Sequence, residues 1–278
     1  MHKKKFITFI SLVVVTLCAI AGCSFFSPTI EQTSKPIAST SAVPPVKQEN
    51  VQLTISSAAS LKEALVEITP LYSKDKTNIA IRNNFGSSGE LQQQIINGAP
   101  VDVFISAATK QMDELQKQNL LVADTRHNLL SNRLVLIVPA DKSDTNDLKD
   151  LTKTNIERIA IGDPRSVPAG QYAEQALTKL NLLSEIRPKF VLGSNVRQVL
   201  QFVESGNAQA GLVYATDAKT STKVKVVQVI DSQLHKPIVY PIAVLQKSTN
   251  QSSAKSYVEF LSSEPAKTIF EKYGFSTL

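Results

Sequence analysis

From residue 51 onward, short apolar runs alternate with longer amphipathic segments, and this alternation restricts the possible folds more than any other feature of the chain. Strands alternating with helices indicate an α/β fold with mostly parallel sheets. The expected strands are 51–56, 78–82, 101–105, 134–138, 158–161, 189–192, 210–214, 224–230 and 238–245. The expected helices lie near 60–74, 88–97, 109–118, 168–180, 195–205, 251–262 and 264–273.

Two extended runs far apart in the sequence, 134–138 and 238–245, suit a pair of hinge strands between two lobes. The first follows a polar, basic stretch that we expect to be a turn (124–133), and the second is interrupted by Pro241. We therefore expect a first lobe from residues 51–132 and 240–278, and a second lobe from residues 133–239. A single continuous sheet is the alternative that the pattern leaves open.

The N-terminal segment, residues 1–22, predicts an export signal. Lys3–Lys5 precede an apolar stretch, 6–20, which is too short to span a membrane comfortably. Small residues then stand directly before Cys23, as in a bacterial lipobox, where the signal is removed and the cysteine thiol carries a diacylglycerol. We expect Cys23 to be lipidated and the mature protein to be anchored to the cell membrane outside the cytoplasm, at the cell surface or in a periplasm. An ordinary export signal is the alternative.

Residues 24–50 follow the cysteine and are rich in Ser, Thr and Pro, without helical or strand periodicity. This composition is typical of a flexible tether. A tether of this length reaches roughly 30 Å. We therefore expect 23–50 to hold the folded part of the chain close to a membrane surface while leaving it free to turn.

Charge and cysteine content exclude several classes of protein. The formal net charge of +6 falls to +3 when the three lysines of residues 1–22 are removed, because that segment holds no acidic residue. Such a charge is ordinary for a soluble domain, and we expect no nucleic-acid partner. The two cysteines stand at positions 18 and 23. Loss of one with the signal and lipidation of the other leave no thiol for a disulfide, a thiolate zinc site or a redox couple.

The usual signatures of catalysis are missing from the sequence. The Ser pair in 86–89 has the wrong spacing for a nucleophile elbow, and there is no glycine pattern for a nucleotide phosphate. His127 and His235 have no metal-ligand spacing to each other or to an acidic pair, and we expect them in turns or at the surface. We therefore expect no enzyme, no cofactor and no direct metal-cation site. A secreted serine hydrolase that uses Ser60 or Ser88 with a histidine is the alternative from another class.

Helix starts carry the strongest functional signal. Four of them directly follow expected strands, and their capping signals are Ser60 with Glu63, Ser87 with Glu90, Pro168 and Asn195. Ligands of open α/β sheets bind at this end of the strands. Each helix N-terminus offers free amides and about half a positive charge, so that several together attract an anion without a cationic side chain. The alternative for each signal is an ordinary helix cap.

Several motifs give the chain from residue 51 to its end a resemblance to a known family. They are Ala58-Ala59-Ser60-Leu61, Phe85-Gly86-Ser87-Ser88, the run 98–107, Gly162-Asp163-Pro164 with Val167-Pro168-Ala169-Gly170, Val196-Arg197, Gly211-Leu212-Val213-Tyr214 with Asp217-Ala218, and Tyr273-Gly274-Phe275. The sequence resembles the molybdate-binding proteins of bacterial ABC importers, which have the type II periplasmic-binding-protein fold. The resemblance implies a solute-binding lipoprotein, a monomer, that captures molybdate or tungstate and delivers it to an ABC transporter permease.

The resemblance also implies which residues hold the oxyanion: Ser60, Ser88, Ala169, Val196 and Tyr214. The serines and the tyrosine would contribute hydroxyls, and the other two residues would contribute backbone amides. The chain departs from some relatives in having Gly89 where a third Ser can stand and Gly193-Ser194 before the second amide, which bears on pocket volume. The same fold can bind sulfate, phosphate or thiosulfate, and these ligands remain alternatives.

Three charged residues near these motifs are expected not to contact the ligand. A carboxylate at Asp102 would repel a dianion, so we expect it to have a structural role. Arg165 and Arg197 flank the expected site, and we expect solvated charges or salt bridges between the lobes, since a cation in contact would slow release of the anion.

Overall fold

The computed structural model describes residues 50–141 and 145–278. The expected signal (1–22), Cys23 and the tether up to residue 49 lie outside the described residues. Among the described residues, no helix has both the length and the apolar character needed to cross a membrane.

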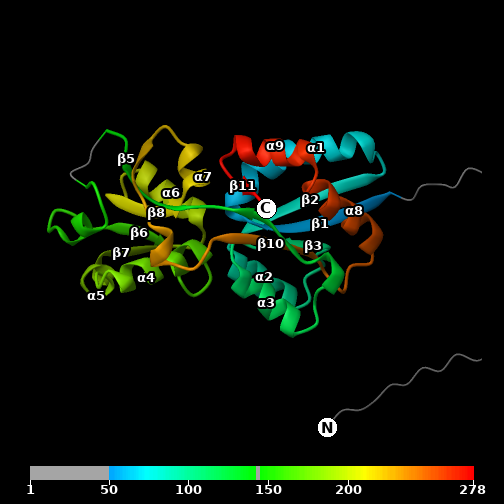
Figure 1. Ribbon diagram of the computed structural model, residues 1–278, viewed down its shortest axis with the longest axis horizontal. Coiled ribbons are helices and arrows are strands. Elements are labelled where there is room, and N and C mark those ends of the chain that lie inside the picture. Colours follow the sequence, from blue (N-terminus) through cyan, green and yellow to red (C-terminus); the bar gives the residue numbers. More distant parts are fainter. Residues whose placement is uncertain (1–49, 142–144) are drawn as a thin grey trace, which may run out of the picture. The chain divides into compact units, whose positions relative to one another are not determined.

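The first sheet has the strand order β11-β4-β10-β3-β1-β2 and carries the first and last parts of the described chain (Figure 1). Its strands are β1 (Val51–Ala58), β2 (Ile79–Gly86), β3 (Val103–Ile105), β4 (His127–Ser131), β10 (Val239–Val244) and β11 (Ser276–Thr277). The helices that accompany it are α1 (Lys62–Asp75), α2 (Ser88–Ile96), α3 (Thr109–Lys117), α8 (Gln251–Leu261) and α9 (Glu264–Lys272).

Helices cover both faces of this sheet, α1, α8 and α9 on one side and α2 and α3 on the other (Figure 1). In strand β3, successive side chains pack against the helices on opposite faces of the sheet. Val103 and Ile105 belong to the cluster that includes the apolar side chains of α1 and α8, whereas Phe104 between them packs with those of α2 and α3. Successive strand residues point to opposite faces. An apolar run such as 103–105 therefore fits a strand covered on both sides.

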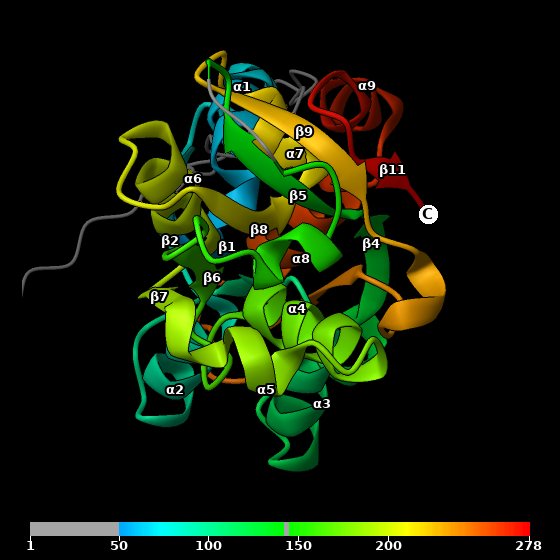
Figure 2. The same ribbon diagram turned by 90° about the vertical axis from the view of Figure 1, so that its left-hand side faces the viewer.

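The second sheet has the strand order β7-β6-β8-β5-β9, and Figure 2 looks toward it. Its strands are β5 (Leu134–Pro139), β6 (Ile159–Gly162), β7 (Phe190–Gly193), β8 (Ala210–Tyr214) and β9 (Val224–Val229). The helices packed around it are α4 (Pro168–Lys179), α5 (Leu183–Ile186), α6 (Val196–Glu204) and α7 (Ala215–Lys219).

Short 3-10 turns occur in both parts of the described chain. They are η1 (Ala59–Leu61), η2 (Ala123–Thr125), η3 (Lys149–Thr152), η4 (Arg187–Lys189) and η5 (Ser232–Leu234).

The chain passes between the two sheets twice in the described region, from β4 to β5 and from β9 to β10. The expected α/β, two-lobed fold is confirmed, but the sheets are mixed where the sequence predicted mostly parallel ones. The parallel pairs are β1–β2, β1–β3, β6–β7 and β6–β8, whereas β10 pairs antiparallel with β3 and β4, and β5 pairs antiparallel with β8 and β9. A strand that arrives from the other lobe does not return through a crossover helix, so it can join its sheet in either direction.

One expected turn is a strand. The stretch 124–133 contains β4, which lies between β10 and β11. The polar residues of β4 misled the prediction, because His127 and Asn128 are exposed while Leu129 and Leu130 are buried. Its two partner strands come more than 100 residues later, so nothing local reveals the pairing.

Candidate anion-binding site

A small cavity lies where the carboxyl ends of strands from both sheets meet the starts of the following helices. Its volume is about 10 Å³. The lining residues are Ala58, Ala59, Ser60, Gly86, Ser87, Ser88, Ala107, Val167, Pro168, Ala169, Asn195, Val196 and Tyr214. The structure therefore brings together all five residues that the family resemblance indicated as ligands. Both lobes contribute to the walls, so moving them apart would widen the cavity.

Ser60 lies in η1, and its expected capping role is wrong. The turn η1 comes between β1 and α1, so that the residue at the N-cap of α1 is Leu61, and no side chain caps this helix. Ser60 is only 3% exposed, and its Oγ is 2.9 Å from the hydroxyl of Tyr240. The capping-box pattern is present in the sequence, but the hydroxyl has a long-range partner instead.

Ser87 and Ser88 have different roles at the start of α2. Ser87 is the N-cap, and its Oγ accepts a hydrogen bond of 3.3 Å from the amide of Glu90, which confirms the expected cap. Ser88 Oγ accepts a hydrogen bond of 2.9 Å from the amide of Ala107. Because a hydroxyl has a single hydrogen and this one is not used in that bond, the hydroxyl of Ser88 can donate into the cavity.

Helix α4 begins at Pro168, as expected, and Ala169 follows inside its first turn. The first amides of a helix have no carbonyl partner within it, so they can face a ligand. Gly170 permits this approach to β6, because a β-carbon at position 170 would lie 1.9 Å from the carbonyl oxygen of Gly162. The run Val-Pro-Ala-Gly thus places the start of α4 directly at the strand end.

Helix α6 also begins at the end of a strand, and the side chain that caps it leaves one amide unused. The side chain of Asn195 accepts hydrogen bonds from the amides of Arg197, at 3.0 Å, and Gln198, at 3.1 Å, which confirms the expected N-cap. Neither bond uses the amide of Val196, which lines the cavity. Two helix N-termini from the second lobe thus face the two serines of the first.

Tyr214 is the last residue of β8, and it is 1% exposed. Its hydroxyl has no hydrogen-bond partner among the residues that the structure describes. Burial raises the pKa of Tyr214 well above its ordinary value, and the nearby Tyr240 adds to this. The hydroxyl therefore stays protonated and is a donor without an acceptor at the edge of the cavity. An unpaired buried donor is costly, and this one is suited to an anionic ligand.

Ion pairs surround the cavity without entering it. Arg197 of α6 pairs with Glu63 of α1, across the lobes, and its Nε is 2.8 Å from Oδ1 of the fully buried Asp217. Burial raises the pKa of Asp217 to about 6, although Arg197 opposes this shift. Arg165 is exposed and pairs with Asp163 of its own loop. Both arginines are thus engaged by carboxylates, in agreement with the roles expected from the sequence.

A backbone contact also joins the lobes beside the cavity. The amide of Gly89 in α2 donates a 2.9 Å hydrogen bond to the carbonyl oxygen of Ser166. A β-carbon at position 89 would lie 2.5 Å from that oxygen. Glycine at this position therefore permits the lobes to approach as closely as they do.

Asp102 directly precedes β3, at the amino end of that strand, and has structural partners there. Its carboxylate accepts hydrogen bonds from the amide of Thr54, at 2.7 Å, and from the hydroxyl of Ser248, at 2.6 Å. His127 is exposed, as expected, but His235 is buried and packs against the ring of Tyr172. Nothing in its local sequence indicates that burial, because the contact comes from α4.

Sequence reasoning missed Tyr240 and Asn132. Tyr240 is completely buried in β10, and its hydroxyl contacts both Ser60 and the side-chain amide of Asn132, the latter at 3.2 Å. The tyrosine stands next to Pro241 in a strand that the sequence did predict. The register of the β10–β4 pairing shifts between these two residues, and no sequence signal reveals this shift.

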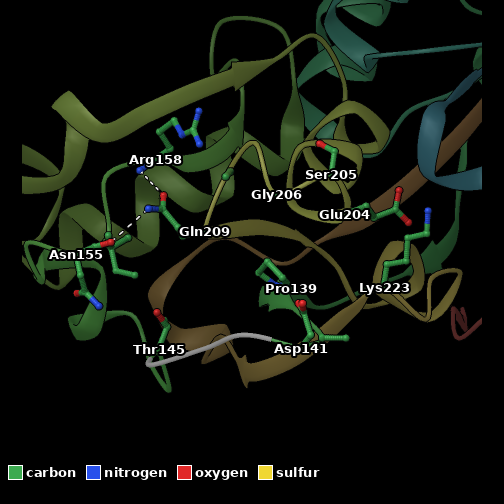
Figure 3. Close-up of a pocket in the computed structure, with 13 residues that line it drawn as sticks. Pro139, Asp141, Thr145, Asn155, Arg158, Glu204, Ser205, Gly206, Gln209 and Lys223 are labelled. Atoms are coloured by element: carbon green, nitrogen blue, oxygen red, sulfur yellow. Dashed lines mark hydrogen bonds between the residues drawn. The ribbon is translucent and has the colours of Figure 1, made fainter.

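A larger cavity of about 720 Å³ lies in the second lobe, at the opposite ends of the strands (Figure 3). The side chain of Gln209 bridges part of its wall, accepting from the amide of Arg158 at 2.8 Å and donating to the carbonyl of Asn155 at 3.3 Å. This cavity is near the amino ends of β6 and β8, and none of the described residues that line it belongs to the first turn of an α-helix. Within residues 50–141 and 145–278, moreover, no cluster of His, Cys, Asp and Glu could hold a metal ion.

Residues 53–276 match the family model described as bacterial extracellular solute-binding protein. The chain belongs to this family. It is 40% identical to YvgL of Bacillus subtilis over 98% of both chains, a protein whose name describes an ABC transporter substrate-binding lipoprotein. It is also 40% identical to the molybdate-binding protein ModA of Haemophilus influenzae, over 82% of this chain and 91% of that one. The periplasmic molybdate-binding protein of Azotobacter vinelandii has the same fold, with a TM-score of 0.72 and 25% identity over 80% of this chain and 98% of that one.

Proposed function

We propose that this protein captures molybdate, and also tungstate, and delivers the anion to an ABC importer. Ser60, Ser88 and Tyr214 would donate hydrogen bonds from their hydroxyls, and Ala169 and Val196 from their backbone amides. The relatives named for molybdate binding support this ligand. The ABC transporter lipoprotein that matches nearly the whole chain supports delivery to an importer.

The observation that carries the proposal is the direction of the hydrogen bonds around the cavity. Ser88 accepts from a backbone amide, and Tyr214 has no acceptor among the described residues. The remaining polar groups offered by the two helix starts are amides, which can only donate. A cavity of donors suits a fully deprotonated tetrahedral dianion such as molybdate, whereas an anion that carries a hydrogen requires an acceptor.

The rest of the proposal concerns the setting of the binding domain. We propose lobes from 51–132 with 240–278 and from 133–239, which close over the anion by hinge motion. The protein would act as a monomer without catalysing a reaction. Cys23 would carry the lipid anchor, and residues 24–50 would serve as the tether that keeps the domain near the permease.

Titration calorimetry with molybdate, tungstate, sulfate and phosphate tests the ligand. We expect molybdate and tungstate to bind more than tenfold more tightly than sulfate or phosphate, because sulfate is smaller and phosphate is protonated. Sulfate binding within tenfold of molybdate would contradict the proposed specificity and favour a more general oxyanion carrier.

A further inference from the structure

Tyr240 does not line the cavity, but its hydroxyl contacts Ser60, which does and which is a proposed ligand residue. We infer that Tyr240 is a positioning residue that, held by Asn132, orients the hydroxyl of Ser60 as a hydrogen-bond donor toward the anion. This inference rests on the proposed function and adds a determinant of selectivity to it.

The direction of the hydrogen bonds begins at Asn132. Its Oδ1 accepts a 2.8 Å bond from the amide of Arg133, which identifies the other atom of the side-chain amide as Nδ2. That nitrogen is within 2.9 Å of Thr216 Oγ1 and 3.2 Å of the Tyr240 hydroxyl. An amide nitrogen has two hydrogens and cannot accept. The hydroxyl oxygen of Tyr240 is therefore an acceptor in this contact.

Among the described residues, the hydrogen of Tyr240 then has one hydrogen-bond partner, Ser60 Oγ at 2.9 Å. The reverse arrangement, with Ser60 donating, would leave the hydrogen of a completely buried phenol without an acceptor. A buried donor without an acceptor is strongly disfavoured. Ser60 Oγ thus accepts from Tyr240, and its own hydrogen is left to point into the cavity.

The hydroxyl oxygens of Ser60 and Ser88 therefore both accept a hydrogen bond that orients the hydroxyl, but the donors are different groups. The donor to Ser88 is the backbone amide of Ala107, and no side-chain substitution can remove it. The donor to Ser60 is the side chain of Tyr240, which a substitution can remove. Asn132 lies at the crossing from β4 to β5, and Thr216 belongs to α7 of the second lobe. The donor direction of Ser60 therefore depends on residues from both lobes and from the crossing between them.

Sulfate and hydrogen phosphate provide the test, since near neutral pH both are tetrahedral and of similar size but only phosphate carries a hydrogen. The measurement is displacement of bound molybdate by each anion, at a pH where phosphate is the doubly charged form. In Tyr240→Phe the hydroxyl of Ser60 is free to rotate and accept. We expect molybdate affinity to fall about fivefold and the preference for sulfate over phosphate to shrink by a similar factor.

Asn132→Asp is a second variant that nearly preserves shape and reverses the chain of bonds. A carboxylate accepts from Tyr240, so that Ser60 donates to Tyr240 and presents a lone pair to the cavity. The added negative charge weakens sulfate and phosphate equally, because their charges are equal, and the ratio between them still reports the direction. We expect this ratio to shift toward phosphate.

Tyr257→Phe is the matched control, since Tyr257 is also buried but packs against Tyr72, away from the cavity. It should leave molybdate affinity and the ratio unchanged. If Tyr240→Phe weakens every anion by the same factor, or if neither variant changes the ratio, the positioning role is refuted while the proposed function stands. If the parent protein itself does not bind molybdate, the proposed function fails first.

Discussion

The hydroxyl of Tyr214 offers the most direct test of the proposed site. Replacing Tyr214 with Phe keeps the ring, which lies at 5.9 Å from the ring of Tyr240 in an edge-to-face arrangement, and removes one donor. That donor has no partner among the described residues, so its removal breaks no hydrogen bond of the unliganded protein that the structure records. The free energy of unfolding without ligand should therefore hardly change, or rise slightly.

The cost appears only when the anion is bound. A hydrogen bond to a charged acceptor contributes about 1.5–3 kcal/mol, which corresponds to a fall in molybdate affinity of roughly 10- to 150-fold in Tyr214→Phe. The increase in melting temperature that molybdate gives the parent should shrink accordingly, because ligand stabilisation follows the ratio of ligand concentration to the dissociation constant.

Titration calorimetry measures the affinity, and thermal unfolding with and without molybdate measures the stability. Tyr172→Phe is a suitable control, because Tyr172 is a buried tyrosine of the same lobe. Its hydroxyl donates to the carbonyl oxygen of Pro237, and the residue does not line the cavity. It should bind molybdate as the parent does. The reasoning is refuted if Tyr214→Phe binds as tightly as the parent, or if its melting temperature without ligand is several degrees lower.

Three further predictions concern closure, pH and anchoring. Gly89→Ala should weaken molybdate binding about tenfold or more, because its β-carbon would clash with Ser166 in the contact between the lobes that the structure shows; equal affinity in calorimetry would contradict this. Asp217 binds its proton more tightly in the folded state, so its contribution to stability should fall as pH rises from about 4 to about 6; urea unfolding of Asp217→Asn should lack this part of the pH dependence, and an unchanged profile would oppose it. Cys23→Ala should release the protein from membranes in cell fractionation with molybdate binding intact, and a variant that stays membrane-bound would undermine the lipobox interpretation.

Local signals predicted most of the secondary structure and three of the four helix starts. The helix starts at Ser87, Pro168 and Asn195 depend only on residues a few positions away in the sequence. Their patterns can therefore be recognised from the sequence. Ser60 has the same pattern with Glu63, but a 3-10 turn displaces the helix start and a distant tyrosine takes the hydroxyl. A local motif states what a side chain can do, and tertiary contacts decide whether it does so.

The sequence by itself determined the alternation of strands and helices, and it placed five candidate ligands at strand ends through family motifs. Only the tertiary structure decided the strand directions, the strand β4 and the partners of the hydroxyls. The physical reason is distance along the chain. Ser60 meets Tyr240 across 180 residues, and the direction of that hydrogen bond depends in turn on Asn132. Periodicity and capping arise between near neighbours, whereas the direction of a buried hydroxyl is set by whichever donors the fold brings beside it.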